Sequence, residues 1–289
     1  MSRRCICMTA YNRPKTLERT LRSLSKCDNI DDYQIIISID GGEGSKQGDI
    51  IALVAKFSNL DISTILHNQN VGCAGNTGFV LENAFSDPNV KEIIFLDDTN
   101  IVSKDFLTYL QAGLDTYRED PTVFAIGAYN RRGSNPQESS YSLCEDFTER
   151  GDPCKVIKAH YFVCAGWAIW RRIWEEIETS DIGWFGTHIC SHPYEGKDWM
   201  WEHIGRTRAD PTGSWAFPFN YYWRKQRAVI VPDVSRCQDG HTSEDWDEKS
   251  TTMEDSYAHT HVYSEYWMGD GVHKIPRTEE LIFPEPVEP

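Results

Sequence analysis

The chain has 289 residues, of which 40% are hydrophobic and 25% charged, a composition typical of globular proteins with room for a sizeable core. Its formal net charge of −15 argues against nucleic acid or an anionic membrane surface as a partner, because both would repel it. No apolar run reaches transmembrane length, so we expect no integral membrane segment. The nine cysteines form no CxxC pair, and we expect reduced thiols. The expected location is the cytoplasm, or else the chain is the soluble part of a membrane-anchored protein whose anchor it lacks.

Strands and helices are predicted to alternate through the first 130 residues. Runs of β-branched and other apolar residues predict strands within 5–12, 34–42, 61–70, 92–98 and 122–129. Apolar residues three and four apart predict helices at 14–27, 48–57, 71–85 and 103–120. Strand starts recur about every 30 residues, the length of a strand–helix–strand unit. We therefore expect an α/β fold with a Rossmann-like, mostly parallel central sheet and helices on both faces.

The pattern changes in the second half of the chain. Residues 156–170 predict either a hairpin or a mixed strand. Further helices are expected at 171–178 and 199–208, and a further strand at 228–235. The Pro- and Glu-rich end, 283–289, predicts an extended or loose tail. Because no clean linker separates the halves, we expect one domain with an elaborated C-terminal half.

Polar residues stand where the predicted strands end. Asp40, Asn70, Asp97 and Asp98 are all in such positions. In open α/β sheets the ligand lies outside the carboxyl ends of the strands, so these side chains should meet at one site. The dinucleotide fingerprint GxGxxG and the phosphate loop GxxxxGK(S/T) are both absent. Carboxylates beside a diphosphate make sense when they grip ribose hydroxyls or hold a divalent cation between the charges.

Several motifs, in order along the chain, carry a resemblance to a known family. They are TAYNRPKTLERTLRSL, ISIDGG, NQNVGCAGNTGF and FLDDTNIVSKDFL in the first half, and CAGWAIWRRIWEEI, GKDWMWEHI and IVPDVSRCQDGH in the second. Together they resemble the GT-A-fold glycosyltransferases that use nucleotide-sugar donors. The N-terminal half is similar to family 2 and the C-terminal half to the N-acetylglucosaminyltransferase I type.

The resemblance implies an inverting enzyme that transfers a hexosyl or pentosyl group from a nucleotide diphosphate sugar, with a UDP-sugar favoured, to a hydroxyl of a glycan acceptor. It implies a donor-binding half at 1–130 and an acceptor-binding and catalytic half at 131–289 of one GT-A domain. The residues that it assigns to donor binding are Thr9, Tyr11, Arg13, Asp40, Asn70, Gly72, Gly75, Asn76 and Asp97. It further implies Asp198 as the catalytic base, with Asp98 and His241 as ligands of a divalent metal, Mn2+ or Mg2+, that binds with the nucleotide.

These assignments compete with structural alternatives. Asp40 before two glycines suits a turn, Asp198 suits a helix N-cap, and His241 lies in an acidic stretch typical of a surface. Thr99 stands where the last acid of the family's DXD-like motif would ligate manganese, and a neutral hydroxyl is a poor ligand for a hard dication. Either Asp98 takes the metal role, or the metal is weakly held or unnecessary, or the chain is a variant; we favour Asp98.

All ten tryptophans lie after residue 160. Aromatic faces stack on sugars, so we expect the C-terminal half to hold the acceptor, with Trp184 and Trp215 as contacts; alternatively, the tryptophans build a core. Two other functions stay open: a carbohydrate-binding protein that kept the fold and lost catalysis, and a sugar nucleotidyltransferase. The nucleotidyltransferase would need a Gly-rich loop after the first strand, where TAYNRP has no glycine.

Overall fold

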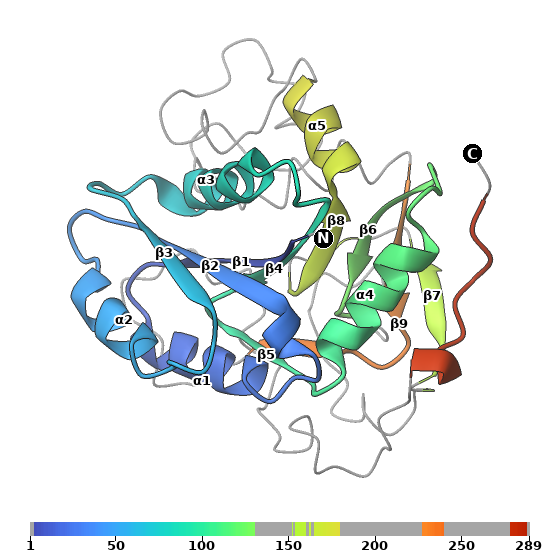
Figure 1. The fold of residues 1–289 in the computed structure, drawn as a ribbon, viewed down its shortest axis with the longest axis horizontal. Coiled ribbons are helices and arrows are strands. Elements are labelled where there is room, and N and C mark those ends of the chain that lie inside the picture. The colour runs from blue at the N-terminus through green and yellow to red at the C-terminus, as the bar shows by residue number, and fades with distance from the viewer. Residues whose placement is uncertain are drawn as a thin grey trace, which may run out of the picture.

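The computed structural model describes residues 3–130, 152, 154–159, 162, 165–179, 227–239 and 278–287. The helices among them are α1 (Pro14–Leu24), α2 (Gln47–Val54), α3 (Gly72–Ser86), α4 (Phe106–Thr116) and α5 (Arg171–Thr179), with short 3-10 turns at Ile30–Asp32 and Thr278–Glu280. These helices cover both faces of a central eight-stranded sheet (Figure 1). In that view α3 and α5 lie above the sheet, and α1, α2 and α4 lie below it.

The sheet takes strands from both halves of the chain. Their order across the sheet is β3 (Ile62–Leu66), β2 (Tyr33–Ile39), β1 (Arg4–Ala10), β4 (Glu92–Asp97), β8 (Trp167–Trp170), β6 (Val123–Gly127), β9 (Ala228–Pro232) and β7 (Val156–Ala159). Strands β3, β2, β1 and β4 are parallel, as are β6 and β9, whereas β8 and β7 run antiparallel to their neighbours. The expected α/β class with a mostly parallel sheet is confirmed.

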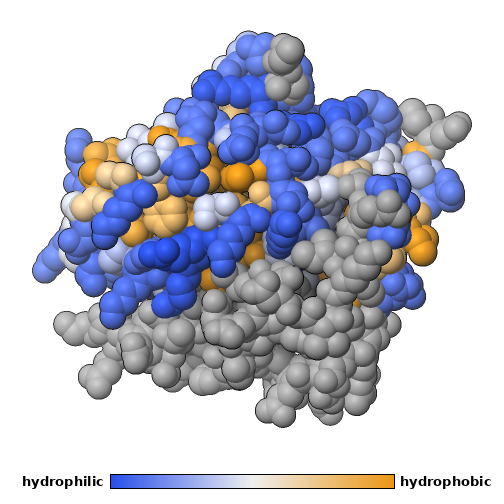
Figure 2. Space-filling model, turned by 60° about the horizontal axis from the view of Figure 1, so that its bottom comes forward, coloured by the Kyte–Doolittle hydropathy of each residue, from blue (hydrophilic) through white to orange (hydrophobic). Residues whose placement is uncertain are grey.

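Burial on both faces explains why the central strands are apolar throughout. Every residue of β1 from Cys5 onward is buried, and so is every residue of β2 from Ile35 onward. In α1 the leucines at helical spacing, Leu17, Leu21 and Leu24, are fully buried. The face of the molecule in Figure 2 is accordingly hydrophilic over most of its described residues, with apolar side chains showing between the polar ones. Within the described ranges, no helix combines the length and the apolar character needed to cross a membrane.

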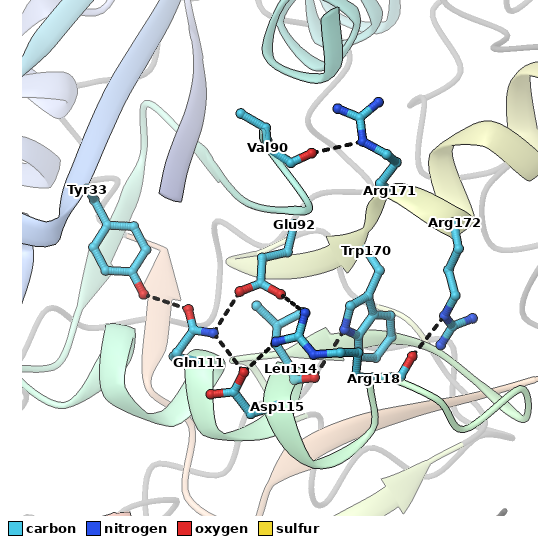
Figure 3. A network of polar contacts seen from close by, with 10 residues as sticks. All are labelled: Tyr33, Val90, Glu92, Gln111, Leu114, Asp115, Arg118, Trp170, Arg171 and Arg172. Carbon is cyan, nitrogen blue, oxygen red and sulfur yellow. Dashed lines mark hydrogen bonds and ion pairs between the residues drawn. The ribbon is translucent and has the colours of Figure 1, made fainter. Parts of the chain in front are cut away.

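A polar network holds the amino end of β4 (Figure 3). Glu92, buried at the start of β4, lies 3.1 Å from the guanidinium of Arg118 and accepts a 2.7 Å hydrogen bond from Gln111. Arg171 donates to backbone carbonyls at the end of α3 and to that of Val90 before β4. Arg172 donates to carbonyls between α4 and β6 and to that of Val123 at the start of β6. The Arg118 contact neutralises the buried charge of Glu92, and the Arg171 contacts cap α3, so this end of the sheet is built for stability. Its opposite, carboxyl edge is the place to look for a ligand site.

The described part of the C-terminal tail, residues 281–287, packs beside α4 and β7. Ile282 forms a bridge with the segment before β7, and its N–H donates to the carbonyl of Cys154 at 2.7 Å. The N–H of Val287 donates at 2.8 Å to the buried carboxylate of Asp120, just beyond α4. This segment contains neither a helix nor a strand, as its composition predicted, yet it is tied to the domain by hydrogen bonds.

The hairpin alternative for residues 156–170 is wrong. Strand β7 lies at the outer edge of the sheet against β9, while β8 lies in the centre between β4 and β6. Trp167 supplies the physical reason, since it is fully buried and stacks on Phe95 of β4 with ring centroids 5.1 Å apart. A large apolar side chain of this kind gains most from the middle of the sheet, where both faces are covered.

A small second sheet of β5 (Asn100–Val102) and β10 (Cys237–Asp239) was not expected from the sequence. Its pairing also moves the start of α4 from the expected Ser103 to Phe106. The N–H of Ser103 donates to the carbonyl of Arg236 at 2.9 Å, and its hydroxyl donates to Asp105 at 2.6 Å. Ser103 therefore ends the strand pairing instead of beginning the helix.

Candidate functional site

The carboxyl ends of β1 and β4 mark the point where the chain order across the sheet reverses. From β1 the chain adds β2 and β3 on one side, and β4 then lies on the other side. At such switch points open α/β sheets leave a crevice that holds ligands. Thr9 of β1 and Asp97 of β4 are paired residues here, and the Thr9 hydroxyl donates to the Asp97 carboxylate at 3.4 Å. Two of the predicted donor-binding residues thus lie together at the expected edge of the sheet.

The acid turn, residues Asp97 to Asn100, leads from β4 into β5. Asn100 folds its side chain back, and its amide oxygen accepts a 3.0 Å hydrogen bond from the N–H of Asp97. Asp97 and Asp98 are half-buried, whereas Thr99 is only 8% exposed. A carboxylate at position 99 would be buried, which is costly without a partner. The turn therefore presents Asp97 and Asp98 toward solvent instead of position 99, and a metal role for Asp98 stays a prediction.

Asp40 is buried at the end of β2, and its carboxylate accepts hydrogen bonds from the backbone. One oxygen accepts from the N–H groups of Gly41 at 2.9 Å and Val71 at 2.8 Å, and the other from Gly72 at 3.0 Å. Val71 is the N-cap position of α3 and has no capping bond from its own side chain. Asp40 supplies the negative charge that the start of a helix favours. The structure thus gives Asp40 a part in holding α3, while contact with a donor base stays a prediction.

The loops after β2 and β3 approach each other closely. A Cβ on Gly41 would lie 2.8 Å from the backbone nitrogen of Gln69 and closer still to the carbonyl oxygen of His67. Real Cβ atoms essentially never come so near, so only glycine fits this position without movement of the backbone. Asn70, an exposed residue of the second loop, accepts a 2.8 Å bond from the N–H of Gly72 and closes the turn into α3. The predicted Asn70 therefore shapes the loop, whatever else it binds.

The first turns of α3 rest on the ends of β1 and β2. Gly72 has a φ of +75°, a backbone conformation that favours glycine. Gly75 is buried, and the amide of Asn76 donates to the carbonyls of Ser38 at 3.0 Å and Ala10 at 3.4 Å. With 3% of its surface exposed, Asn76 has almost none left for a ligand. Its clearest role in the structure is to hold α3 against the two strands.

Tyr11 and Arg13 lie on the loop between β1 and α1. The Tyr11 phenol donates to the carbonyl of Glu43 at 2.5 Å, and its own carbonyl accepts a 3.0 Å bond from the N–H of Lys46. These bonds tie the exit of β1 to the loop after β2. Arg13 is half-buried at the N-cap position of α1. A cation at this position opposes the helix dipole, whose positive end is also at the start of α1. An anionic ligand there would be attracted both by the Arg13 guanidinium and by the helix N-terminus.

Two hydroxyl residues of α1 that were not expected at the site hold the acid turn and β5. Thr20 of α1 donates to the carbonyl of Asp98 at 3.1 Å, and Ser23 of α1 accepts a 3.2 Å bond from the N–H of Val102. The signal was present in TLERTLRS, where hydroxyl residues recur at helical spacing beside the buried leucines. Such a pattern places hydroxyls at the margin of the buried face, where they need partners.

The remaining predicted site residues lie outside the described part of the chain: Asp198, His241, Trp184 and Trp215. The backbone pairing of β10 with β5 sets Asp239 opposite Asn100, so the chain that leads to His241 runs beside the acid turn. Among the described residues, no group of three or more His, Cys, Asp or Glu side chains is placed to hold a metal ion. Two neighbouring carboxylates are nevertheless the oxygen donors that a hard dication takes, so the acid turn fits part of such a site.

Residues 5–178 match the profile of glycosyl transferase family 2. The chain belongs to glycosyl transferase family 2. Among curated proteins, this family-2 chain is 21% identical over 182 residues to an alpha-1,3-mannosyl-glycoprotein 2-beta-N-acetylglucosaminyltransferase of Arabidopsis thaliana, a match that covers 60% of this chain and 38% of that protein.

One solved structure shows the same fold at low sequence identity. GalNAc-T7 with UDP, GalNAc and Mn2+ matches with a TM-score of 0.52 at 15% identity, over 87% of the family-2 chain and 45% of that chain. The mannosyltransferase PcManGT from Pyrobaculum calidifontis, in complex with GDP-Man and Mn2+, has a TM-score of 0.45 at 13% identity, over 81% of this chain and 57% of that one. The chain spans less than two thirds of the length of each of these three proteins.

The expected GT-A fold and the expected glycosyltransferase family are thus confirmed. The family assignment rests on the first half and the start of the second, and it includes β1 to β4 with the acid turn.

Proposed function

We propose that this family-2 protein transfers a sugar from a nucleotide diphosphate sugar to a hydroxyl of a glycan acceptor, with inversion at the anomeric carbon. The observation that carries the proposal is the pairing of Thr9 with Asp97 at the switch point, beside the two half-buried carboxylates of the acid turn. Carboxylates at this edge are suited to a ribose and to a metal-bound diphosphate. GalNAc-T7 was solved with UDP and Mn2+, which supports UDP and Mn2+ as first choices here.

The donor is proposed to bind to residues 1–130 and the acceptor to residues 131–289. Asp97 contacts the ribose, Arg13 contacts the diphosphate, and Asp98 with His241 holds the divalent metal. When bound, the metal offsets the charge of the diphosphate, which a chain of net charge −15 would otherwise repel. The resident protein groups then have to orient the donor and keep its anomeric carbon open to attack from one face.

The catalytic base is proposed to be Asp198. It takes the proton from the acceptor hydroxyl as the acceptor oxygen forms its bond to the anomeric carbon and the bond from that carbon to the diphosphate breaks. A single displacement of this kind needs one base and no enzyme nucleophile, and it inverts the anomeric centre. The nucleoside diphosphate leaves with the electron pair of the broken bond.

The broadest test is hydrolysis and transfer with a panel of nucleotide-sugars, with and without Mn2+. A glycosyltransferase should release a nucleoside diphosphate slowly from one or two donors and faster when the right acceptor is added. A sugar nucleotidyltransferase would instead release pyrophosphate from a nucleoside triphosphate and a sugar phosphate. Binding of a glycan with no turnover of any donor would favour the carbohydrate-binding alternative and contradict the proposal.

The role of Asp198 is tested by Asp198→Ala. Donor binding should stay intact while turnover falls by a factor on the order of 100 to 10,000, the usual contribution of a general base. Asp61→Ala is the control, because Asp61 is an exposed aspartate ahead of the edge strand β3. Near-normal turnover of the Asp198 variant would remove this residue from the base role.

The metal is tested by calorimetry. Thr99 lowers the negative charge of the acid turn by one relative to a third acid, so Mn2+ titrated into the free protein should give little heat, and into UDP-saturated protein a clear signal. Asp98→Asn should abolish that second signal, whereas Asp97→Asn should chiefly weaken UDP. Full activity in excess chelator would contradict the metal proposal and leave cationic side chains such as Arg13 to neutralise the leaving group.

The acceptor assignment is tested with Trp184→Ala and Trp215→Ala. If these side chains stack on the acceptor glycan, each variant should raise the acceptor KM and leave the donor KM unchanged. An unchanged acceptor KM in both variants would mean that the two tryptophans do not contact the acceptor.

A further inference from the structure

Helix α1 carries a buried line of hydroxyl groups, which we call the hydroxyl stripe: Thr16, Thr20 and Ser23. All three are essentially inaccessible to solvent. Each donates to a carbonyl about one turn earlier in the chain: Thr16 to Arg13 at 2.9 Å, Thr20 to Thr16 at 3.3 Å, and Ser23 to Thr20 at 2.8 Å. Buried hydroxyls in helices commonly bond in this way. By itself the stripe would be only a satisfied polar margin of the helix.

Two members of the stripe also bond outside the helix, and both reach the segment after β4. The Thr20 hydroxyl lies 3.1 Å from the carbonyl oxygen of Asp98, nearer than the 3.3 Å to its own helix carbonyl. A hydroxyl has one hydrogen to donate, so the two carbonyls compete for it and the shorter distance favours Asp98. Ser23 accepts from the N–H of Val102 at 3.2 Å. The stripe thus docks α1 on both the acid turn and β5.

We propose that Thr20 is a positioning residue for the acid turn: its hydroxyl holds the backbone at Asp98 and so sets the direction in which the Asp97 and Asp98 carboxylates leave the sheet. This inference rests on the proposed function, since it assigns those carboxylates to the donor and its metal. Two further bonds support the same turn, from Thr9 to the Asp97 carboxylate and from the Asp97 N–H to Asn100. Thr20 is fully buried, so it can hold the turn through the backbone without touching a ligand itself.

The hydroxyl of Thr20 has to be there for its partner and not for packing. Valine has nearly the same shape as threonine and would fill the same buried space, but it has no hydroxyl and cannot donate to the carbonyl of Asp98. Outer contacts of this kind orient metal-binding side chains, and their loss typically lowers metal affinity about 10- to 100-fold in metal sites. Loss of the Thr20 hydroxyl should therefore lower the affinity for the metal-bound nucleotide, although the methyl groups of valine keep the packing.

The test compares Thr20→Val, which loses the hydroxyl, with Thr20→Ser, which keeps it. Thr77→Val is the matched control, because Thr77 is also fully buried and donates to a carbonyl one turn earlier in its helix, that of Cys73. Two readouts are taken on the full chain: the affinity for UDP with Mn2+ by calorimetry, with GDP as a second probe, and hydrogen exchange of the peptide that spans residues 96–103. Should Thr20→Val not fold, Thr20→Ala against Thr20→Ser gives the same comparison.

Thr20→Val should weaken UDP with Mn2+ about tenfold and speed exchange in the 96–103 peptide about fivefold. Thr20→Ser and Thr77→Val should stay near wild type in both readouts. The inference is overturned if Thr20→Val behaves as wild type, if Thr20→Ser is as impaired as Thr20→Val, or if Thr77→Val gives the same losses. If the wild type binds neither nucleotide, the proposed donor class fails, and the exchange of the 96–103 peptide alone decides whether Thr20 holds the acid turn.

Discussion

Replacing Gly41 with alanine should push apart the two loops that build the candidate site. The added Cβ would lie 2.8 Å from the backbone nitrogen of Gln69 and from the carbonyl carbon of His67, and closer still to that carbonyl's oxygen. Gly48 in the first turn of α2 provides a matched control, because a Cβ there would meet nothing within 4 Å. Both variants gain the same methyl group, but only the methyl group at position 41 would meet the neighbouring loop.

The loss of stability in Gly41→Ala depends on which atoms the added methyl group would meet. The obstructing atoms belong to backbone, which cannot swing aside like the end of a side chain, so the loop after β3 must move as a piece. That movement would also stretch the bonds from Val71 and Gly72 to Asp40. Overpacking costs about 1–3 kcal/mol and a hydrogen bond to a charged group contributes about 1.5–3 kcal/mol, so Gly41→Ala should lower the free energy of unfolding by about 3 kcal/mol. Gly48→Ala should raise it by about 0.5 kcal/mol, since alanine favours a helix.

Urea unfolding followed by tryptophan fluorescence measures both variants under one condition. Gly41→Ala should unfold at a clearly lower urea concentration than wild type. In thermal unfolding, its Tm should be about 6–10 °C below that of wild type. Gly48→Ala should unfold at the same urea concentration as wild type or slightly above it. If the two variants unfold together, the loops are not packed as described and the reasoning from the close approach is wrong.

Three further predictions concern single side chains. Burial would raise the pKa of Asp120, but hydrogen bonds from Thr122 and from the backbone of Val287 outweigh it and hold the pKa below its usual range. The resulting stabilisation is fully present above the unfolded pKa of about 3.9 and is lost as pH falls through the lower folded pKa. Asp120→Asn should therefore lower the free energy of unfolding by about 2 kcal/mol at pH 7, and urea titrations at acid pH should show a progressively smaller loss. Asp40→Asn turns an acceptor into a donor facing backbone N–H groups and should cost about 2 kcal/mol; an unchanged urea midpoint would mean that the carboxylate does not hold α3. Arg171→Lys should lower stability by about 1–2 kcal/mol, because an ammonium cannot span the three carbonyls that the guanidinium reaches, and equal stability of the lysine variant would contradict that role.

Local pattern was sufficient for most elements of the first half. The expected strands overlap β1, β2, β3, β4 and β6, and the expected helices overlap α1, α2, α3 and α4; β1, β2 and α2 begin one residue earlier than expected, and α3 ends one residue later. It was also sufficient to place Asp40 and Asp97 at one edge of the sheet. In a series of strand–helix–strand units every parallel strand ends on the same side, so polar residues after successive strands must lie along one edge. These inferences need only the order of neighbouring elements and no knowledge of distant contacts.

Several features of the site could be decided only by the tertiary structure. The pairing of β10 with β5 joins residues more than a hundred positions apart, and strands of three residues are too short to show a periodic signal. The position of β8 in the centre of the sheet depends on the packing of Trp167 on Phe95, which no local pattern contains. The partners of Asp40 and Thr20 are backbone groups, and every residue type supplies such groups equally. Residue identity alone therefore says that a buried carboxylate or hydroxyl needs a partner, while only the folded chain decides which backbone group comes within reach of it.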